Sequence, residues 1–175
     1  WRQFYLSHAY EQESVRAATD SLTGVANREG FRRYLSRTLS PDKLPAAVLF
    51  VDIDDFKSLN DRFGHEFGDR ALCTVASTLR KSVREEDLIV RWGGEEFIVF
   101  LWNTSLEQAL SIAERICGSV RECKLPFDAE ITVSIGCSGT NNVDEVSRLV
   151  YEADHALYRA KHEGKNRVYV AAASE

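Results

Sequence analysis

The chain alternates between short, continuously apolar runs and longer stretches with helical spacing. Residues 46–51 are all apolar, which is typical of a strand covered on both faces rather than of an alternating edge strand. Residues 88–92 and 97–101 predict two further strands, and residues 131–135 and 167–170 predict two more. The pattern therefore predicts a sheet whose first strand is buried on both of its faces.

The pair Gly93-Gly94 separates the second predicted strand from the third. Both residues tolerate positive φ, which the tight turns of two-residue hairpins require. We therefore expect these two strands to form a hairpin with the glycines at its tip.

Apolar side chains recur at helical spacing in four stretches, at residues 31–39, 69–83, 106–120 and 143–161. Pro41 and Pro45 follow the first of them and end it. Residues 52–68 are polar and include two glycines, so they predict an irregular connection.

The first 19 residues are polar with scattered large apolar side chains, a helical pattern too sparse to build a core of its own. We interpret residues 1–19 as a linker helix and residues 20–175 as the folded domain. A helix packed on the domain is the alternative for this segment.

The order helix, strand, helix, hairpin, helix, strand, helix, strand contains split β-α-β units. This order predicts an α/β (α+β) sandwich, in which a central mixed β-sheet is flanked by helices, of the ferredoxin-related or palm type.

Composition narrows the function classes. The 175 residues are 44% hydrophobic and 28% charged, and no apolar run approaches the ~18 residues that cross a bilayer. We therefore expect no membrane contact. The formal charge of -5 argues against binding of a nucleic acid polymer, although a small phosphorylated ligand needs only a few local cations.

The four cysteines, Cys73, Cys117, Cys123 and Cys137, lie in apolar, periodic stretches without C-x-x-C spacing. They are interpreted as small core residues in a reducing, cytoplasmic compartment, with a zinc site or disulfides as the less favoured alternative. The chain starts at Trp1 without a signal peptide pattern, so we expect it to be part of a longer protein, which could itself be anchored in a membrane.

Two acids occupy positions suited to a metal. Asp52 ends the buried strand and Glu95 begins the second arm of the hairpin, so their carboxylates converge if the strands are neighbours. Two carboxylates and a backbone carbonyl suit Mg²⁺ and leave coordination positions open for substrate phosphates. The glycines would admit a triphosphate to the hairpin backbone. The alternatives are a solvated acidic loop and glycines that serve only the turn.

The run from Gly93 to Phe97 resembles the signature of the GGDEF family, in the Glu-Glu version. The resemblance covers roughly residues 20–170. Further matching stretches are Asp20 to Gly24, Asn27-Arg28, Asp52 to Lys57, Asn60-Asp61, Phe63 to His65, Gly68-Asp69, Ser134 to Gly136, Ala153-Asp154, Ala156 to Tyr158, Ala160-Lys161 and Gly164 to Arg167. Each is weak alone, but together and in this order they are specific.

The resemblance implies a diguanylate cyclase, which condenses two GTP into cyclic di-GMP and two pyrophosphates. Asp52, the carbonyl of Ile53 and Glu95 would bind two Mg²⁺ ions, or Mn²⁺, per active site. Glu96 would be the general base that takes the proton of the attacking ribose 3′-hydroxyl.

The resemblance also implies a set of GTP-binding residues. Asn60 and Asp69 would hydrogen-bond guanine, whose N1 and N2 donors a carboxylate can accept. The other residues of this set are Leu22 and Leu72 for the base, Lys57, Lys161 and Lys165 for the phosphates, and Phe56, Gly93 and Gly94. The family often has Arg at position 165, and Lys lacks its bidentate fork. From the residues alone, Lys161 and Lys165 are equally typical of a solvated helix end.

Arg84 and Asp87 match the family's R-x-x-D product-binding motif just before the hairpin, and Arg115 matches a second arginine of that site. Guanine presents acceptors that suit Arg. The resemblance thus implies feedback inhibition by cyclic di-GMP, and the alternative is an exposed charged turn.

By resemblance, each domain binds one GTP, so catalysis needs a homodimer, aligned by the linker helix of an upstream sensor domain. Three alternatives remain open: a non-catalytic module that binds GTP or cyclic di-GMP, another nucleotidyl transferase or cyclase, and a structural interaction domain.

Overall fold

The computed structural model describes residues 17–172. The expected linker helix therefore lies outside the described residues, apart from its last three positions, and its role stays a prediction. None of the helices in the described part has the length and apolar character needed to span a membrane.

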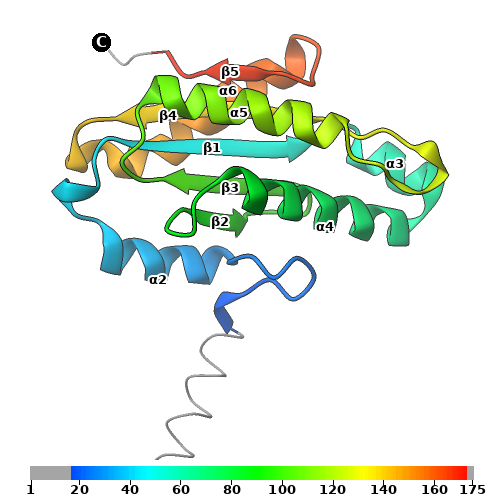
Figure 1. Cartoon of the computed structure of the whole chain (residues 1–175), viewed down its shortest axis with the longest axis horizontal. Coiled ribbons are helices and arrows are strands. Elements are labelled where there is room, and N and C mark those ends of the chain that lie inside the picture. Colours follow the sequence, from blue (N-terminus) through cyan, green and yellow to red (C-terminus); the bar gives the residue numbers. More distant parts are fainter. Residues whose placement is uncertain (1–16, 173–175) are drawn as a thin grey trace, which may run out of the picture.

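A five-stranded mixed sheet forms the centre of the described chain, in the order β2-β3-β1-β4-β5 (Figure 1). Its strands are β1 (Ala46–Ile53), β2 (Leu88–Arg91), β3 (Glu96–Leu101), β4 (Val133–Thr140) and β5 (Val168–Val170). Only the pairing of β4 with β5 is parallel, and the other three are antiparallel. The mixed sheet confirms the predicted fold class.

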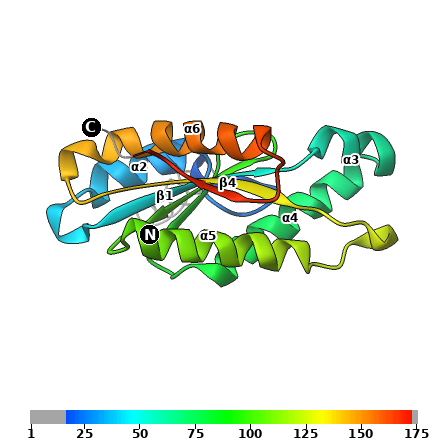
Figure 2. The same cartoon turned by 90° about the horizontal axis from the view of Figure 1, so that it is seen from above.

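Helices cover both faces of the sheet, with α4 and α5 on one side and α2 and α6 on the other (Figure 2). The helices are α2 (Arg28–Thr38), α3 (Phe56–Phe63), α4 (His65–Ser82), α5 (Leu106–Arg121) and α6 (Leu149–His162), with 3₁₀ turns at Pro41–Lys43, Pro126–Asp128 and Val143–Arg148. The stretch predicted as one helix over residues 143–161 is thus a 3₁₀ turn followed by α6.

The apolar run of β1 is continuous because its two faces belong to two different cores. Ala47, Leu49 and Val51 are fully buried in the core on the α4–α5 side. Val48 and Phe50 alternate with them and are buried in the core on the α2–α6 side. A strand buried on both faces needs apolar side chains on both, which residues 46–51 provide. The same alternation carries on to Asp52, at the end of the strand.

α6 packs unusually close to the sheet because of Gly136 in β4. A Cβ at this position would overlap the carbonyl oxygen of Ala153 and the amide nitrogen of Leu157. Glycine therefore allows the backbone of α6 to lie directly on β4, which fixes the position of the helix that carries Lys161.

The expectation of an irregular connection over residues 52–68 is wrong. α3 occupies much of it, and α4 begins at His65, four residues earlier than the expected start at residue 69. Phe56, Leu59 and Phe63 are partly buried against the core, which is helical spacing. Gly64, with φ of 87°, divides this pattern between two helices, and each part is too short to be recognised alone.

The hairpin exists, but its turn differs from the expected one. Neither Gly93 nor Gly94 has a positive φ; among the described glycines this conformation occurs at Gly24, Gly64 and Gly164. The amides of Trp92 and Gly93 both donate to the carbonyl oxygen of Glu96, at 2.8 and 3.3 Å, so the loop is wider than two residues. The two-residue turn with positive φ is therefore corrected.

The expected burial of the cysteines holds for two of them. Cys117 and Cys137 are buried, and burial raises the pKa of each thiol to about 12. Cys73 is exposed and Cys123 is half-buried, so these two are not core residues, because they lie on the outer sides of their segments. All four are free thiols in this structure.

Candidate active site

The sheet brings the predicted acids together at the carboxyl end of β1. Asp52 is the direct cross-strand partner of Glu96 on β3, and the amide of Ile53 donates to the carbonyl oxygen of Glu95 at 3.3 Å. Antiparallel pairing of β1 with β3 thus brings Asp52 next to Glu95 and Glu96, which lie more than 40 residues later in the chain.

Burial and the repulsion between neighbouring carboxylates both raise pKa values in this region. Burial raises the pKa of Asp52, and the charges of Glu95 and Asp54 raise it further. Burial also raises the pKa of Glu96, followed by the charges of Asp52, Asp154 and Glu95. Clusters of like charge with raised pKa values are typical of sites that bind a cation or transfer a proton.

The ammonium of Lys161, on α6, lies against these acids. It forms an ion pair with Asp52, another with Asp54 at 2.8 Å, and a hydrogen bond to the carbonyl oxygen of Ile53 at 3.3 Å. Burial alone would lower the pKa of Lys161, but hydrogen bonds to the two carboxylates outweigh burial and raise it. Lys161 is therefore a charged partner of the acids and not a solvated helix end.

Asp54, which has no separate role in the predictions from sequence, organises the far side of this cluster. It is only 5% exposed, and its oxygens accept from Thr132 Oγ1 at 2.6 Å, Ser134 Oγ at 2.7 Å and the amide of Asn166 at 3.0 Å, besides Lys161. Burial would raise the pKa of Asp54, but these donors outweigh it and lower the pKa. Because its acceptor positions are filled from within the chain, Asp54 anchors its neighbours and is not free to bind a metal.

The remaining oxygens fit a divalent metal. Asp52, Glu95 and the carbonyl of Ile53 offer the hard ligands that Mg²⁺ prefers, and a cationic ammonium already contacts two of them. Within residues 17–172, no cluster of three or more His, Cys, Asp or Glu side chains is arranged to hold a metal. A metal here would therefore complete its coordination with further oxygens, from water or from a substrate.

The two hairpin glycines differ in what their environment requires. A Cβ at Gly93 would overlap Oε2 of Glu96, so glycine leaves room for that side chain. A Cβ at Gly94 would meet nothing within 4 Å, and its φ is not positive. Neither packing nor backbone conformation explains a glycine at position 94. An open surface over the hairpin is what close approach of a ligand to the backbone needs.

The candidates for guanine binding lie where α3 meets α4. Asn60 is on α3, and its Oδ1 is buried without a hydrogen-bond partner, next to Gly68, where a Cβ would overlap it. Asp69 is on α4 and exposed. Leu22 is 36% exposed and Leu72 only 3% exposed, and the carbonyl of Leu22 accepts from the thiol of Cys73 at 3.5 Å. A buried, unpaired acceptor is costly unless a ligand donates to it.

The other GTP candidates occupy the surroundings of α3. Phe56 is partly buried and packs against the core at the start of the helix, whereas Lys57 is exposed. Lys165 has a φ of 61° and its ammonium contacts Asp55 at 2.5 Å. Of the three phosphate candidates, Lys161 is the one that contacts Asp52 and Asp54.

The R-x-x-D residues form a turn beside a pocket. Asp87 accepts from the amide of Arg84 at 2.9 Å and from the amide of Trp102 at 3.3 Å, and burial raises its pKa. Both residues line a pocket of about 400 Å³ together with Gly24 and Arg80. Arg115 does not line this pocket, but it donates to the carbonyl oxygen of Ser82 at 2.8 Å.

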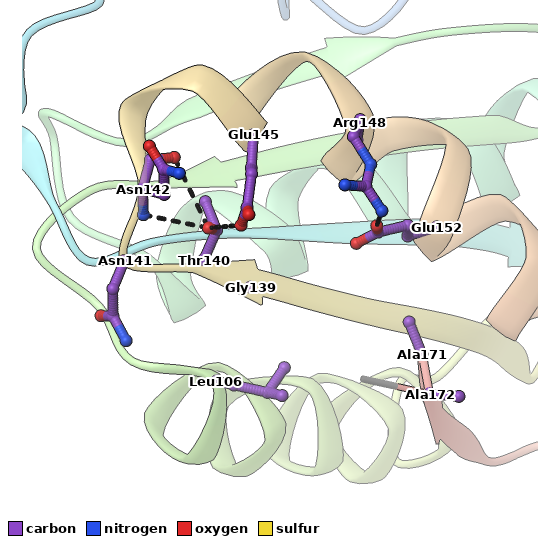
Figure 3. Close-up of a pocket in the computed structure, with 10 residues that line it drawn as sticks. All are labelled: Leu106, Gly139, Thr140, Asn141, Asn142, Glu145, Arg148, Glu152, Ala171 and Ala172. Carbon is purple, nitrogen blue, oxygen red and sulfur yellow. Dashed lines mark hydrogen bonds and ion pairs between the residues drawn. The ribbon is translucent and has the colours of Figure 1, made fainter. Parts of the chain in front are cut away.

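Another pocket, of about 420 Å³, lies at the opposite end of β1, where Thr140 is the partner of Ala46 (Figure 3). Its polar side chains bind one another. Thr140 Oγ1 donates to Glu145 at 2.6 Å, and Arg148 pairs with Glu152 at 3.0 Å. This pocket lies at the other end of β1 from the acids of the candidate site, and its polar groups are already paired with one another.

The family comparison adds to this geometry. The family model described as "Diguanylate cyclase, GGDEF domain" matches residues 17–167. This chain belongs to the GGDEF domain family. Diguanylate cyclase DgcM of Escherichia coli K12 is 40% identical over 165 residues, which cover 92% of this chain and 40% of DgcM. The chain thus spans less than half the length of that relative.

Solved GGDEF domains have the same architecture. The coiled coil and GGDEF domain of DgcB from Caulobacter crescentus, in complex with c-di-GMP, has a TM-score of 0.88 at 29% identity, over 97% of this chain and 94% of that one. The active GGEEF domain of a diguanylate cyclase from Vibrio cholerae has a TM-score of 0.70 at 33% identity, over 84% of this chain and 92% of that one.

Two arginines that sequence reasoning left out hold the GGDEF hairpin in place. Arg91 donates to the carbonyl oxygen of Gly94 at 2.8 Å and pairs with Asp20 at 3.1 Å. Arg28 donates to the carbonyl oxygen of Trp92 at 2.6 Å and lies 4.4 Å over its ring. Arg28 lies inside a matching stretch, whereas Arg91 lies just before the hairpin signature and has no signal of its own in the sequence. Their partners are as many as 71 residues away, which a local pattern does not show.

Proposed function

We propose that this chain is the catalytic domain of a diguanylate cyclase, which condenses two GTP into cyclic di-GMP and two pyrophosphates. Family membership and the curated diguanylate cyclase relatives support this activity. The observation that carries the proposal is the convergence of Asp52, Glu95 and Glu96 at the hairpin, beside a glycine at position 94 that nothing in the fold requires.

GGDEF diguanylate cyclases generally depend on a divalent metal. In this chain Asp52, the carbonyl of Ile53 and Glu95 would hold Mg²⁺, or Mn²⁺, as two ions per active site. A metal held by these residues would supply positive charge that offsets the charge of the triphosphate. The protein's own part is to supply Asp52, which strand pairing holds in a mostly buried position, and Glu95, which lies in the hairpin loop next to the partner residue of Asp52.

Glu96 is the proposed general base. Its carboxylate lies beside Asp52 and Glu95 without belonging to the metal ligands, and burial and these charges raise its pKa. A carboxylate of raised pKa is a stronger base, so Glu96 is suited to accept the proton of the ribose 3′-hydroxyl. Gly93 leaves the space in which this side chain lies.

Guanine would be recognised between α3 and α4. The unpaired Oδ1 of Asn60 and the exposed carboxylate of Asp69 are acceptors for the N1 and N2 donors of guanine, with Leu22, Leu72 and Phe56 lining the approach. Adenine presents no such pair of donors. Lys57, Lys161 and Lys165 would meet the phosphates, and Gly93 and Gly94 would admit them to the hairpin.

One domain holds half of the reaction, so two copies would face each other to place each 3′-hydroxyl at the other α-phosphorus. Residues 1–19 would align the copies as the tail of an upstream sensor. Use of GTP implies a cytoplasmic location.

Product would bind Arg84 and Asp87 at the pocket of about 400 Å³, with Arg115 nearby, and would inhibit the enzyme. Solved structures of the GGDEF domain of DgcB contain c-di-GMP, which supports a product site in this family.

The decisive test is to incubate the domain with GTP and Mg²⁺ and to resolve the nucleotides by chromatography. We expect cyclic di-GMP from the parent and roughly 10²-fold less, or lower still, from Glu96→Gln. A parent protein that binds GTP without making cyclic di-GMP would contradict the proposal and favour a non-catalytic module. Double substitution of Arg84 and Asp87 by Ala should abolish product binding in isothermal titration and relieve inhibition.

A further inference from the structure

The ammonium of Lys161 occupies the oxygens that the proposed function assigns to a metal. Its three partners are the carboxylate of Asp52, the carbonyl of Ile53 at 3.3 Å and the carboxylate of Asp54 at 2.8 Å. The first two are the proposed metal ligands from β1. The ammonium of Lys161 and the proposed metal would therefore bind the same two groups, the carboxylate of Asp52 and the carbonyl of Ile53.

Two cations cannot share these ligands at close range without strong repulsion. Like charges at contact distance repel strongly in a partly buried site, and the double charge of a divalent ion doubles the repulsion. Lys161 is only 22% exposed on its side chain, so solvent screens the repulsion incompletely. Binding of a divalent ion to Asp52 and Ile53 must therefore move the ammonium.

The surrounding fold keeps Asp54 hydrogen-bonded during this movement. Asp54 retains three donors from Thr132, Ser134 and Asn166 when Lys161 turns away, so its buried carboxylate loses one ion pair but keeps these hydrogen bonds. α6 itself is held on the sheet by the close contact at Gly136. The four-carbon stem of Lys can move its ammonium while the helix stays in place.

We infer that Lys161 is a positioning residue that competes with the divalent metal for Asp52 and Ile53, and that metal binding releases its ammonium toward the phosphates of the substrate. The inference rests on the proposed function, since that assigns the metal to these oxygens. Competition between Lys161 and the metal would make the binding of metal and nucleotide cooperative. A metal alone must displace the ammonium, whereas the anionic triphosphate of a bound nucleotide gives it a new partner.

The first experiment measures Mn²⁺ affinity without nucleotide, by electron paramagnetic resonance. Lys161→Met should bind Mn²⁺ roughly tenfold more tightly than the parent, because it removes a charge-assisted competitor from both ligands. Lys81→Met is the control, since Lys81 is an exposed lysine in the last turn of α4 and its loss changes the net charge equally. Asp52→Asn should abolish the binding of Mn²⁺ and so identify the site.

Affinity of Lys161→Met equal to that of Lys81→Met, or weaker, would overturn the inference, as would Mn²⁺ binding that survives Asp52→Asn. Circular dichroism checks that each variant is folded.

The second experiment needs no variant. The parent is acylated with acetic anhydride in rising Mg²⁺, without nucleotide, and each lysine is quantified by peptide mass spectrometry. Labelling of Lys161 should rise several-fold and saturate with the metal, while that of Lys81 stays constant. Constant or falling labelling of Lys161 contradicts the release. Neither experiment uses turnover, so a failure here is distinguishable from a failure to make cyclic di-GMP.

Discussion

The two ends of β1 satisfy their polar side chains in opposite ways. At its amino end, Thr140 binds Glu145, and Arg148 pairs with Glu152. At its carboxyl end, acids of like charge crowd together, and Asn60 keeps a buried oxygen unpaired. Polar groups that bind one another within the chain stabilise the fold. Clustered like charges and unpaired polar atoms lower its stability, and they are typical of sites where a ligand supplies the missing partner. The contrast favours the carboxyl end as the place of the proposed site.

The largest expected effect comes from one substitution at each end. Glu96→Gln should lower turnover by roughly 10²- to 10⁴-fold, because it removes the base. It should also raise the melting temperature in EDTA at neutral pH. Because the folded pKa of Glu96 is raised, the ionised carboxylate disfavours the folded state at a pH above its ordinary pKa, and Gln removes that penalty.

Thr140→Val is the matched change at the amino end. It breaks the bond to Glu145 and should cost about 1 kcal/mol of unfolding free energy while turnover stays unchanged. Chromatography of product and thermal melts measure both variants. A melting temperature that falls in Glu96→Gln as it does in Thr140→Val would remove the contrast between the two ends.

Two glycines give the next effect. Gly136→Ala should destabilise the fold by about 1–3 kcal/mol or more, since a Cβ would overlap the backbone of α6. Gly94→Ala should leave stability within about 0.5 kcal/mol, because nothing lies within 4 Å of its Cβ, yet turnover should fall roughly tenfold or more as the methyl group meets the triphosphate. Urea titrations and product assays separate the two. Full activity of Gly94→Ala would leave that glycine without explanation.

The smallest effect concerns Asp20, an acid near the hairpin whose charge is well matched. Burial would raise the pKa of Asp20, but hydrogen bonds from Thr23 and the charge of Arg91 outweigh it and lower the pKa. A lowered pKa stabilises the fold above the unfolded value near 4 and loses this effect as pH falls through the folded value. Asp20→Asn should therefore cost about 1 kcal/mol at pH 7 and progressively less below pH ~4.

Urea unfolding across this pH range measures the effect. The exposed pair of Glu29 with Arg33 provides the control, and Glu29→Gln should show a weaker pH dependence because solvent screens it. A constant gap between Asp20→Asn and the parent at all pH values would contradict the assignment.

The strands were predictable because each is a compact apolar run, and the buried β1 is the clearest case. α3 was missed because Gly64 cuts its pattern short, and the turn at Gly93 was misjudged because Trp92 and Glu96 set its hydrogen bonds. These outcomes depend on contacts that a local pattern does not contain.

For the candidate site, the sequence predicted which residue types to examine, and strand pairing places Asp52 beside Glu96. It did not predict that Lys161 reaches Asp54 or that Asp54 is saturated with donors, because those partners are as many as 112 positions apart. The roles of these residues in the reaction stay predictions.

Arg91 has a mechanical consequence. Its guanidinium is fastened to Asp20 at 3.1 Å and to the carbonyl of Gly94 at 2.8 Å, and its own amide is bonded to Ala26 at 2.8 Å. One side chain thus joins the entry segment of the domain to the tip of the hairpin. We expect a displacement of Asp20 to be passed through Arg91 to the loop at Gly94.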